Sequence, residues 1–351
     1  MFQALRGYHS AALSHIDGGV KIITELQKSC QPDDGLCLST TPYVPLPILS
    51  QIFTRLDTQA SQIVHGRPRH LLCQNLTMKD SGYDPDVPTS FDSLESARNS
   101  LTYIRNCAIG TSQSLPNTYT ADPKTGPKLP VEAVEIKLSL DLIRNSSVVR
   151  LKQWSLAFER LLQDKHDWNK SEQKATSILK LHRVLMGLNF SIDFVRAMND
   201  EMIWDECLQD FEVMILYAEE VIASTAEAKN QPTFTLDTEI ILPLYFTAVK
   251  CRYGRLRRKA IALLRSQQRQ EGIWNSLLAA SVSERLMEIE EEGLEGRSIE
   301  AERVLRWNRV RGVEISLDTE HKRARLKYIK LRADWGTEEM IERIEWSRQE
   351  R

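Results

Sequence analysis

The chain lacks the short sequence signatures that mark most catalytic and nucleotide-binding sites. Among its 351 residues there is no Gly-x-Gly-x-x-Gly, no phosphate-binding loop, no Gly-x-Ser-x-Gly and no His-Glu-x-x-His. Each of these patterns places glycine, a nucleophile or metal ligands at the spacing that its chemistry needs. Their absence leaves enzyme chemistry without support, so we expect a protein that is not an enzyme and that uses no cofactor.

Cysteine pairs at metal-binding spacing are also missing. The six cysteines are scattered over positions 30, 37, 73, 107, 207 and 251, and none belongs to a Cys-x-x-Cys pair. Scattered thiols predict neither a disulfide framework nor a zinc module. The segment HGRPRHLLC offers His65, His70 and Cys73 as candidate metal ligands, but no fourth ligand stands at a standard spacing, so we predict no metal site.

No apolar run is long enough to cross a bilayer. The longest uncharged run, residues 240–249, is interrupted by Pro243 and is far shorter than the roughly 20 residues that a membrane-spanning helix needs. The N-terminal sequence MFQALRGYHSAALSH lacks the continuous apolar core of a secretory signal. With a formal net charge of −2, the chain as a whole has no preference for a polyanion. We therefore expect an intracellular protein without a membrane partner.

Helical periodicity is what the chain has in abundance. Apolar residues recur every three or four positions along most of residues 1–305. Successive amphipathic helices bury their apolar faces by packing as antiparallel hairpins, so we predict an all-α fold of stacked antiparallel helical hairpins. Residues 110–130, rich in Gly, Pro, Ser and Thr, predict a flexible loop within this helical domain.

Two features of the helical region have more than one interpretation. An apolar stripe over the first 27 residues needs a partner, which is either absent from this polypeptide or supplied by a distant segment. This stripe comprises Leu5, Tyr8, Ala12, Ile16, Val20 and Ile23. The tryptophans Trp154, Trp168, Trp204 and Trp274 would either fill the core or line a ligand pocket. Aromatic residues at helical spacing usually fill the core, which is the interpretation we favour.

The C-terminal part, residues 306–351, has a different pattern. RGVEISLD and RARLKYIKLR alternate apolar and polar residues on either side of DTEHK, which predicts a small β-hairpin over roughly residues 311–332. Val313, Ile315 and Leu317 would face one side of it. An isolated hairpin is only marginally stable, so we expect this side to pack on the helical domain. A short charged tail helix is expected to close the chain.

A basic stretch raises the main question about a functional site. Residues 250–269 contain eight lysines and arginines in total and no aspartate or glutamate. Leu256, Ala260, Leu263 and Leu264 share one helical face, which leaves Arg255, Arg257, Arg258 and Lys259 around the rest. Such a cluster suits nuclear import or anion binding, but a solvated helix face is commoner and is favoured here. Replacing Arg257, Arg258 and Lys259 with Gln is then expected to leave the fold intact.

A third interpretation of the basic stretch is pairing within the chain. Residues 284–302 contain eight glutamates against two arginines, Arg285 and Arg297. Opposite charges on two neighbouring helices would pair and orient them. Exposed ion pairs contribute only about 0.2 to 1 kcal/mol each, so such pairing would orient the helices more than stabilise them.

Several separated blocks of the sequence resemble a known family. They are ALRGYHSAALSHIDGGVKII, FTRLDTQAS, TSFDSLESARNSL, LPLYFTAVKCRYGRLRRKAIALLRSQQRQEGIWNSLLAA and IEEEGLEG. These blocks are similar to the helical C-terminal region of fungal transcription factors whose DNA-binding module is a binuclear zinc cluster. The resemblance runs across nearly the whole chain and is strongest over residues 236–293. It implies a helical regulatory domain in the nucleus, in factors that often control secondary-metabolite gene clusters.

One departure from this family limits what the resemblance implies. The family holds two zinc ions with six closely spaced cysteines and places a short helix in the major groove of DNA. No such cluster occurs in this sequence. We therefore expect transcription regulation through protein partners, with dimerisation as one form of partnership, and no sequence-specific DNA binding by this chain. The alternative is a cytoplasmic interaction scaffold with no role at DNA.

Overall fold

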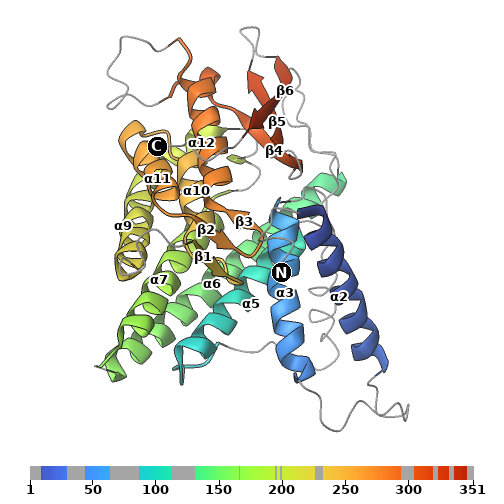
Figure 1. The fold of residues 1–351 in the computed structure, drawn as a ribbon, viewed down its shortest axis with the longest axis vertical. Coiled ribbons are helices and arrows are strands. Elements are labelled where there is room, and N and C mark those ends of the chain that lie inside the picture. The colour runs from blue at the N-terminus through green and yellow to red at the C-terminus, as the bar shows by residue number, and fades with distance from the viewer. Residues whose placement is uncertain are drawn as a thin grey trace.

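The computed structural model describes residues 9–29, 44–63, 87–112, 131–165, 167–193, 196–197, 200–225, 232–293, 304–318, 323–331 and 336–345. Within these ranges the protein is mostly helical and contains two small three-stranded sheets (Figure 1). The predicted all-α class is confirmed at this coarse level. None of the helices in the described part combines the length and the apolar composition that crossing a bilayer requires.

The helices lie in the region where the apolar periodicity predicts them, but the helix Leu94–Ser112 extends into the loop predicted over residues 110–130, whose remaining residues lie outside the described ones. In chain order they are α2 (His9–Ser29), α3 (Leu46–Ile63), α5 (Leu94–Ser112), α6 (Val131–Asp164), α7 (Lys170–Ser191), the 3-10 helix η2 (Glu201–Cys207), α9 (Leu208–Ser224), α10 (Ile241–Lys250), α11 (Gly254–Ser266), α12 (Ser276–Glu291) and the 3-10 helix η4 (Arg306–Asn308). The start of α7 is fixed by a capping box, in which Asn169 Oδ1 accepts from the Glu172 amide and Glu172 Oε2 accepts from the Asn169 amide, each at 3.0 Å.

The largest hydrophobic core lies where α7, α9, α10 and α11 meet. Phe211, Met214 and Ala218 of α9 are wholly buried in it, as are Ile241 and Ala248 of α10. Buried residues of α2 join the same core, namely Ile16, Val20 and Ile23. The partner that the N-terminal stripe requires is therefore within this chain, because α2 packs against α3. Leu5 and Tyr8 of the predicted stripe lie outside the described residues.

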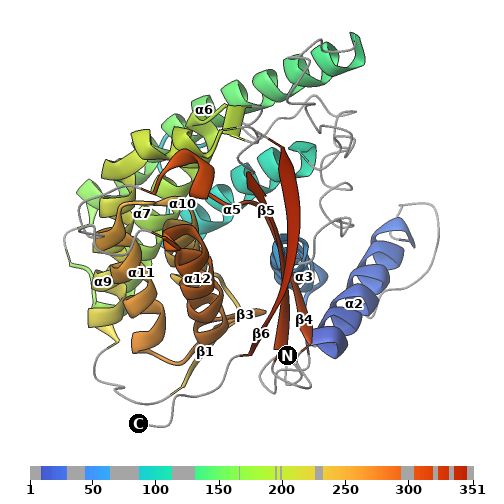
Figure 2. The same ribbon diagram turned by 90° about the horizontal axis from the view of Figure 1, so that it is seen from above.

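A second core joins α5, α6 and α7 around Trp154. This indole is wholly buried, stacks on Phe158 at 4.7 Å between ring centroids, and donates from Nε1 to the Ala97 carbonyl at 2.8 Å. The other predicted tryptophans pack similarly: Trp204 and Trp274 are buried in the first core, and the partly buried Trp168 packs against the second. The core interpretation of the tryptophans is confirmed. Part of α6 extends past this core (Figure 2).

A small mixed sheet in the helical region was not predicted. It consists of β1 (Thr233–Thr235), β2 (Arg269–Glu271) and β3 (Trp274–Asn275), with β1 and β2 parallel and β2 and β3 antiparallel. Gly272, at φ +57°, makes the turn between β2 and β3. Because β1 and β2 are far apart in sequence, no local pattern announces their pairing. The sheet fixes the chain entering α10 against the chain leaving α11.

The C-terminal sheet confirms the predicted hairpin and corrects the prediction for the tail. β4 (Arg311–Asp318) and β5 (Arg323–Leu331) pair antiparallel, as their alternation predicts. The prediction of a tail helix is wrong, because Thr337–Glu345 form the strand β6, which pairs with β5. Cross-strand contacts favour the strand, because Lys327 lies 2.9 Å from Glu339 and Tyr328 donates to Glu342 at 2.7 Å. Leu326, Tyr328 and Ile344 pack on α12.

Candidate functional site

The predicted basic cluster on α11 does not form one surface. Arg255 and Lys259 are exposed and Arg258 is partly buried, but Arg257 is wholly buried. Arg257 Nε donates to the Ala248 carbonyl at 2.8 Å, and its Nη1 lies 2.7 Å from Glu290 Oε2. The placement of Arg257 on a solvated face is therefore wrong. The expectation that Gln at Arg257, Arg258 and Lys259 leaves the fold intact loses its premise, because one of the three is a core side chain.

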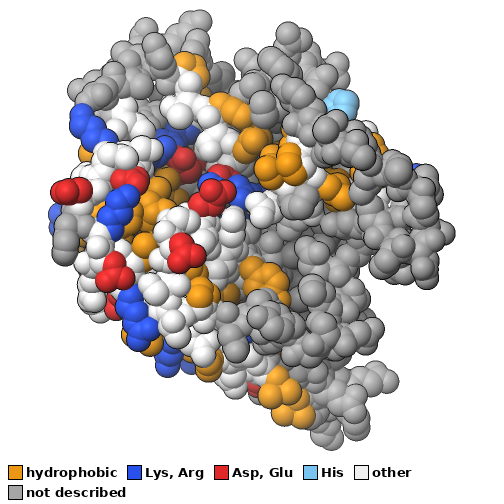
Figure 3. All heavy atoms as spheres, turned by 90° about the horizontal axis from the view of Figure 1, so that it is seen from below, with side chains coloured by type: hydrophobic (Ala, Val, Ile, Leu, Met, Phe, Trp, Pro, Cys, Tyr) orange, Lys and Arg blue, Asp and Glu red, His pale blue; other side chains and the backbone are white. Residues whose placement is uncertain are grey.

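Most of the basic stretch is paired within the chain. Seven of its eight cations lie within ion-pair distance of a carboxylate, and Arg255 is the exception among the described residues. The pairs are Lys250 with Glu201, Arg252 with Glu201 and Glu290, Arg257 with Glu290, Arg258 with Glu291, Lys259 with Glu219, Arg265 with Glu284, and Arg269 with Glu239 and Glu271. Figure 3 shows positive and negative side chains interspersed over the described part of one face.

The pairing with the acidic stretch is partly a core interaction, which the sequence did not indicate. Glu290 is wholly buried between Arg252, at 2.9 Å, and Arg257, at 2.7 Å, and it also accepts from the Val310 amide at 2.9 Å. Burial by itself would raise the pKa of Glu290, but the two guanidinium groups outweigh it and lower the pKa to about 2. Glu290 therefore holds the turn between α10 and α11 against the chain entering the C-terminal sheet.

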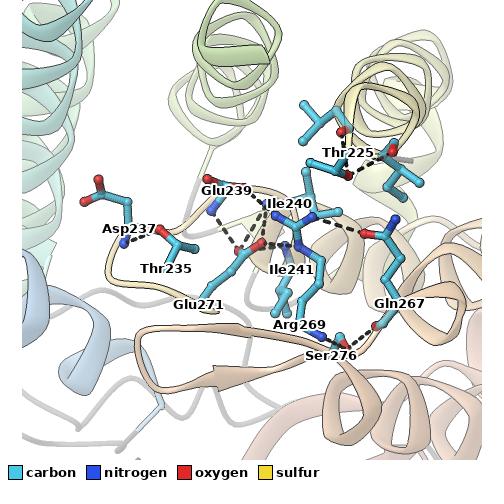
Figure 4. Close-up of polar contacts among 12 residues, drawn as sticks. Thr225, Thr235, Asp237, Glu239, Ile240, Ile241, Gln267, Arg269, Glu271 and Ser276 are labelled. Atoms are coloured by element: carbon cyan, nitrogen blue, oxygen red, sulfur yellow. Dashed lines mark hydrogen bonds and ion pairs between the residues drawn. The ribbon is translucent and has the colours of Figure 1, made fainter. Parts of the chain in front are cut away.

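A second buried carboxylate positions α10. The helix has no capping side chain at Ile240, and Glu271 of β2 takes that role (Figure 4). Its carboxylate accepts from the amides of Glu239, Ile240 and Ile241 at 2.8 to 3.1 Å. Arg269 pairs with both Glu271 and Glu239. The segment just before α10 is thereby held in place, with Asp237 pointing away from this cluster (Figure 4).

That segment forms one wall of a pocket, which is the candidate functional site. Asp237, Thr238 and Glu239 face α3, α5 and α7 across a cavity of about 360 Å³. Ligand pockets in proteins measure roughly 300 to 1,000 Å³, so the cavity can hold a small molecule. Its apolar lining is provided by α5 and α7 through Leu94, Leu101, Ala175, Ile178, Leu179 and Met186. The tryptophans are absent from the lining of this pocket.

Positive charge converges on the pocket from three helices. Arg55 of α3 and Arg98 of α5 share a single carboxylate, that of Asp237, at 3.0 and 2.8 Å. Lys174 of α7 lies 2.9 Å from Glu239, which also pairs with Arg269. Arg105 of α5 forms no ion pair with any residue that the structure describes, and its Nε is buried without a hydrogen-bond partner.

Desolvation governs the pKa values of two titratable groups that line the pocket. Desolvation lowers the pKa of Arg105 to about 10, with Asp237 opposing this effect and Arg55 adding to it. Arg105 still carries its charge at neutral pH. Desolvation, assisted by Arg105, lowers the pKa of His182 to about 4. The neutral imidazole donates from Nε2 to the Glu239 carbonyl at 2.9 Å, so it braces the wall of the pocket.

The pocket assembles residues that no local sequence pattern connects. Arg98 and Arg105 lie seven positions apart, so they share one face of the helix α5. This spacing is the one local sequence signal for the cationic wall of the pocket. The remaining polar groups come from α3, α7 and the segment before α10. Of the predicted cluster, Arg255 and Lys259 line a separate cavity between α9 and α11 of about 410 Å³. His65, His70 and Cys73, considered for a metal, lie outside the described residues.

Comparisons with known proteins assign no family to this chain. No family model matches the chain, and neither a curated protein nor a solved structure matches it significantly.

Proposed function

We propose that this chain is a transcription-regulator domain that acts through protein contacts and does not read DNA bases itself. Its resemblance to the regulatory region of fungal zinc-cluster factors motivates the proposal, as do the stacked antiparallel helical hairpins that we infer for its helices. We further infer a nuclear location and a role at a secondary-metabolite gene cluster. Neither catalysis nor a zinc ion has a part in this function.

The internal neutralisation of the basic stretch is the observation that carries the proposal. Proteins gain affinity for DNA chiefly by setting lysines and arginines against phosphates. In residues 250–269, seven of the eight cations already have a carboxylate of this chain as partner, and only Arg255 in this stretch lacks one among the described residues. The basic stretch therefore supports the folding of the helical body more than a phosphate-binding surface. Because the described cations of this stretch, Arg255 excepted, are engaged within the chain, we favour contacts with other proteins as the way in which the domain acts.

Two measurements on the full chain test the proposal. Fused to an unrelated DNA-binding module in a reporter strain, the chain is expected to change transcription. In a gel-shift titration on promoter DNA at several salt concentrations, the unfused chain is expected to bind weakly and equally to scrambled duplex. Tight, sequence-selective binding by the unfused chain would contradict the proposal, and so would a fusion that is nuclear and folded but leaves the reporter unchanged.

The alternative function is an interaction scaffold with no role at DNA. Exposed apolar side chains on α6 favour protein contacts of either kind, namely Leu138, Leu142, Val149 and Leu156. The location of a fluorescently tagged chain separates the two functions. A tagged protein that stays in the cytoplasm and recovers only cytoplasmic partners would favour the scaffold.

A further inference from the structure

The pocket between α3, α5 and α7 has more positive than negative charge among its described residues. Its lining contains Arg55, Arg98, Arg105 and Lys174 against Glu95, Asp237 and Glu239. The side chain of Glu95 is 71% exposed, so it neutralises the interior least. The other two carboxylates are each shared between two cations: Asp237 by Arg55 and Arg98, and Glu239 by Lys174 and by Arg269 behind the wall.

Arg105 is the cation of the lining that this arrangement leaves without a direct ion pair among the described residues, although Asp237 lies near enough to act on its charge. No carboxylate in the described part of the chain pairs with it, and its Nε has no hydrogen-bond partner. Arg105 is half-buried, with its Nε fully shielded from solvent. A charge in such a position without an ion-pair partner is costly, and proteins retain such groups mainly where they serve a site. Deprotonation does not relieve this cost at neutral pH, because the pKa of Arg105 falls only to about 10.

The rest of the lining specifies what else a ligand must carry. Leucine, isoleucine and methionine side chains of α5 and α7 form an apolar wall beside the cationic one. A group that only neutralised Arg105, such as a small inorganic ion, would leave this apolar surface uncovered. A carboxylate attached to an aliphatic or aromatic body would satisfy both walls, because guanidinium and carboxylate pair with two parallel hydrogen bonds.

We propose that this pocket binds a small organic carboxylate, with Arg105 pairing with its carboxylate and the α5–α7 wall covering its apolar body. The site is separate from the basic stretch on α11 and does not depend on the proposed role in transcription. Arg98 and Lys174 lie at the same cavity and would share the added negative charge. His182, neutral and bound to the Glu239 carbonyl, keeps the opposite wall in place.

Calorimetric titration of the full chain tests the proposal with a matched panel of probes. The panel contains benzoate, phenylacetate and octanoate, each beside its primary amide, and inorganic phosphate. We expect at least one carboxylate to bind about tenfold or more tightly than its own amide, since the amide cannot supply the counter-charge. We also expect phosphate, which has no apolar body, to bind more weakly than that carboxylate. Failure of all three carboxylates to bind, or equal binding of each carboxylate and its amide, would overturn the proposal.

Variants then connect the binding to Arg105. Arg105→Gln is expected to weaken the best carboxylate about tenfold or more and to leave the binding of its amide unchanged. Arg183→Gln, on the same helix as Lys174 but outside the pocket lining, is the matched control and should bind like the unaltered chain. Arg105→Lys keeps the positive charge and should retain part of the affinity for the carboxylate. This result would show that the loss of affinity in Arg105→Gln comes from the lost charge and not from loss of folding. Unchanged carboxylate binding in a folded Arg105→Gln protein would overturn the assignment of Arg105.

Discussion

The buried arginines around Glu290 and the half-buried arginines of the pocket differ in what surrounds them. Around Glu290, the guanidinium groups of Arg252 and Arg257 each lie within 3 Å of the carboxylate, at 2.9 and 2.7 Å. In the pocket, Arg105 pairs with no carboxylate of the described ranges, although Asp237 is close enough to raise its pKa. The first group uses its charges to hold elements together. The second leaves one charge available, and this difference distinguishes a structural cluster from a candidate binding site.

The connectivity of the two groups supports the same distinction. The cluster at Glu290 joins the α10–α11 turn, α12, η2 and the chain entering the C-terminal sheet, and Arg309 extends it by pairing with Asp205 at 2.8 Å. These segments also share buried apolar contacts. The pocket instead lies between helices that approach each other without filling the space between them. The second arrangement therefore borders a cavity that a ligand can enter.

The largest effect is expected from removing the shared carboxylate. Glu290→Gln leaves Arg252 and Arg257 buried with less counter-charge, so we expect the free energy of unfolding to fall by about 3 to 5 kcal/mol. Urea denaturation monitored by circular dichroism measures this change. Lys259→Gln, which breaks the exposed pair with Glu219, is the control and should change the free energy of unfolding by less than about 1 kcal/mol. Equal effects of the two variants would remove the distinction between the buried cluster and the surface pairs.

A somewhat smaller effect is expected from the pH dependence of the pocket wall. The pKa of His182 is about 4 in the folded chain against an ordinary value of 6.5, so its contribution to stability is complete above pH 6.5 and is lost as the pH falls towards 4. The loss amounts to about 3 kcal/mol at most.

Denaturation curves recorded between pH 7 and pH 4 check the contribution of His182. His182→Gln can still donate to the Glu239 carbonyl and does not titrate in this range, so its stability should fall less steeply over the same interval. Glu290, with a pKa of about 2, stays ionised in the folded chain over this interval and contributes alike in the variant and the unaltered chain. Identical pH profiles for the variant and the unaltered chain would show that His182 is not buried as a neutral group.

The smallest change in the free energy of unfolding is expected at Arg105, where the substitution should not destabilise the protein. Arg105→Met removes a half-buried charge that has no ion-pair partner in the described part of the chain, so the free energy of unfolding should stay the same or rise by about 1 kcal/mol. Arg257→Met removes one of the two guanidinium partners of Glu290, which keeps Arg252, and should lower the free energy of unfolding by roughly 2 kcal/mol. Thermal and urea denaturation of both variants measure the two changes. A loss of stability in Arg105→Met as large as in Arg257→Met would place Arg105 with the structural cluster.

The spacing of apolar residues predicted those helices and strands whose formation depends on the sequence of one segment alone. The helices from α6 to α12 follow the apolar spacing of the sequence, and β4 and β5 follow its alternation. The strand β6 was missed because its charged sequence suits a helix, and only pairing with β5 makes it a strand. The sheet of β1, β2 and β3 was missed for the same reason, since β1 and β2 are separated by two helices.

The candidate site was less predictable than the fold. Arg257 was assigned to a solvated face because charged side chains rarely enter a core, and the carboxylate that permits its burial comes from α12. The pairing of the basic and acidic stretches was one of the alternatives considered, and Arg258 with Glu291 and Arg265 with Glu284 confirm it. The pocket drew no prediction, because its cations stand on three separate helices.

The amino-acid sequence by itself determined the helical class, the burial of the tryptophans and the C-terminal hairpin, because the spacing of apolar residues along one segment is sufficient to decide each of them. Tertiary structure alone decided which charges are buried in pairs and which one faces a cavity. Ion pairing depends on distances of a few ångströms between side chains of different elements, and those distances exist only after the elements have packed.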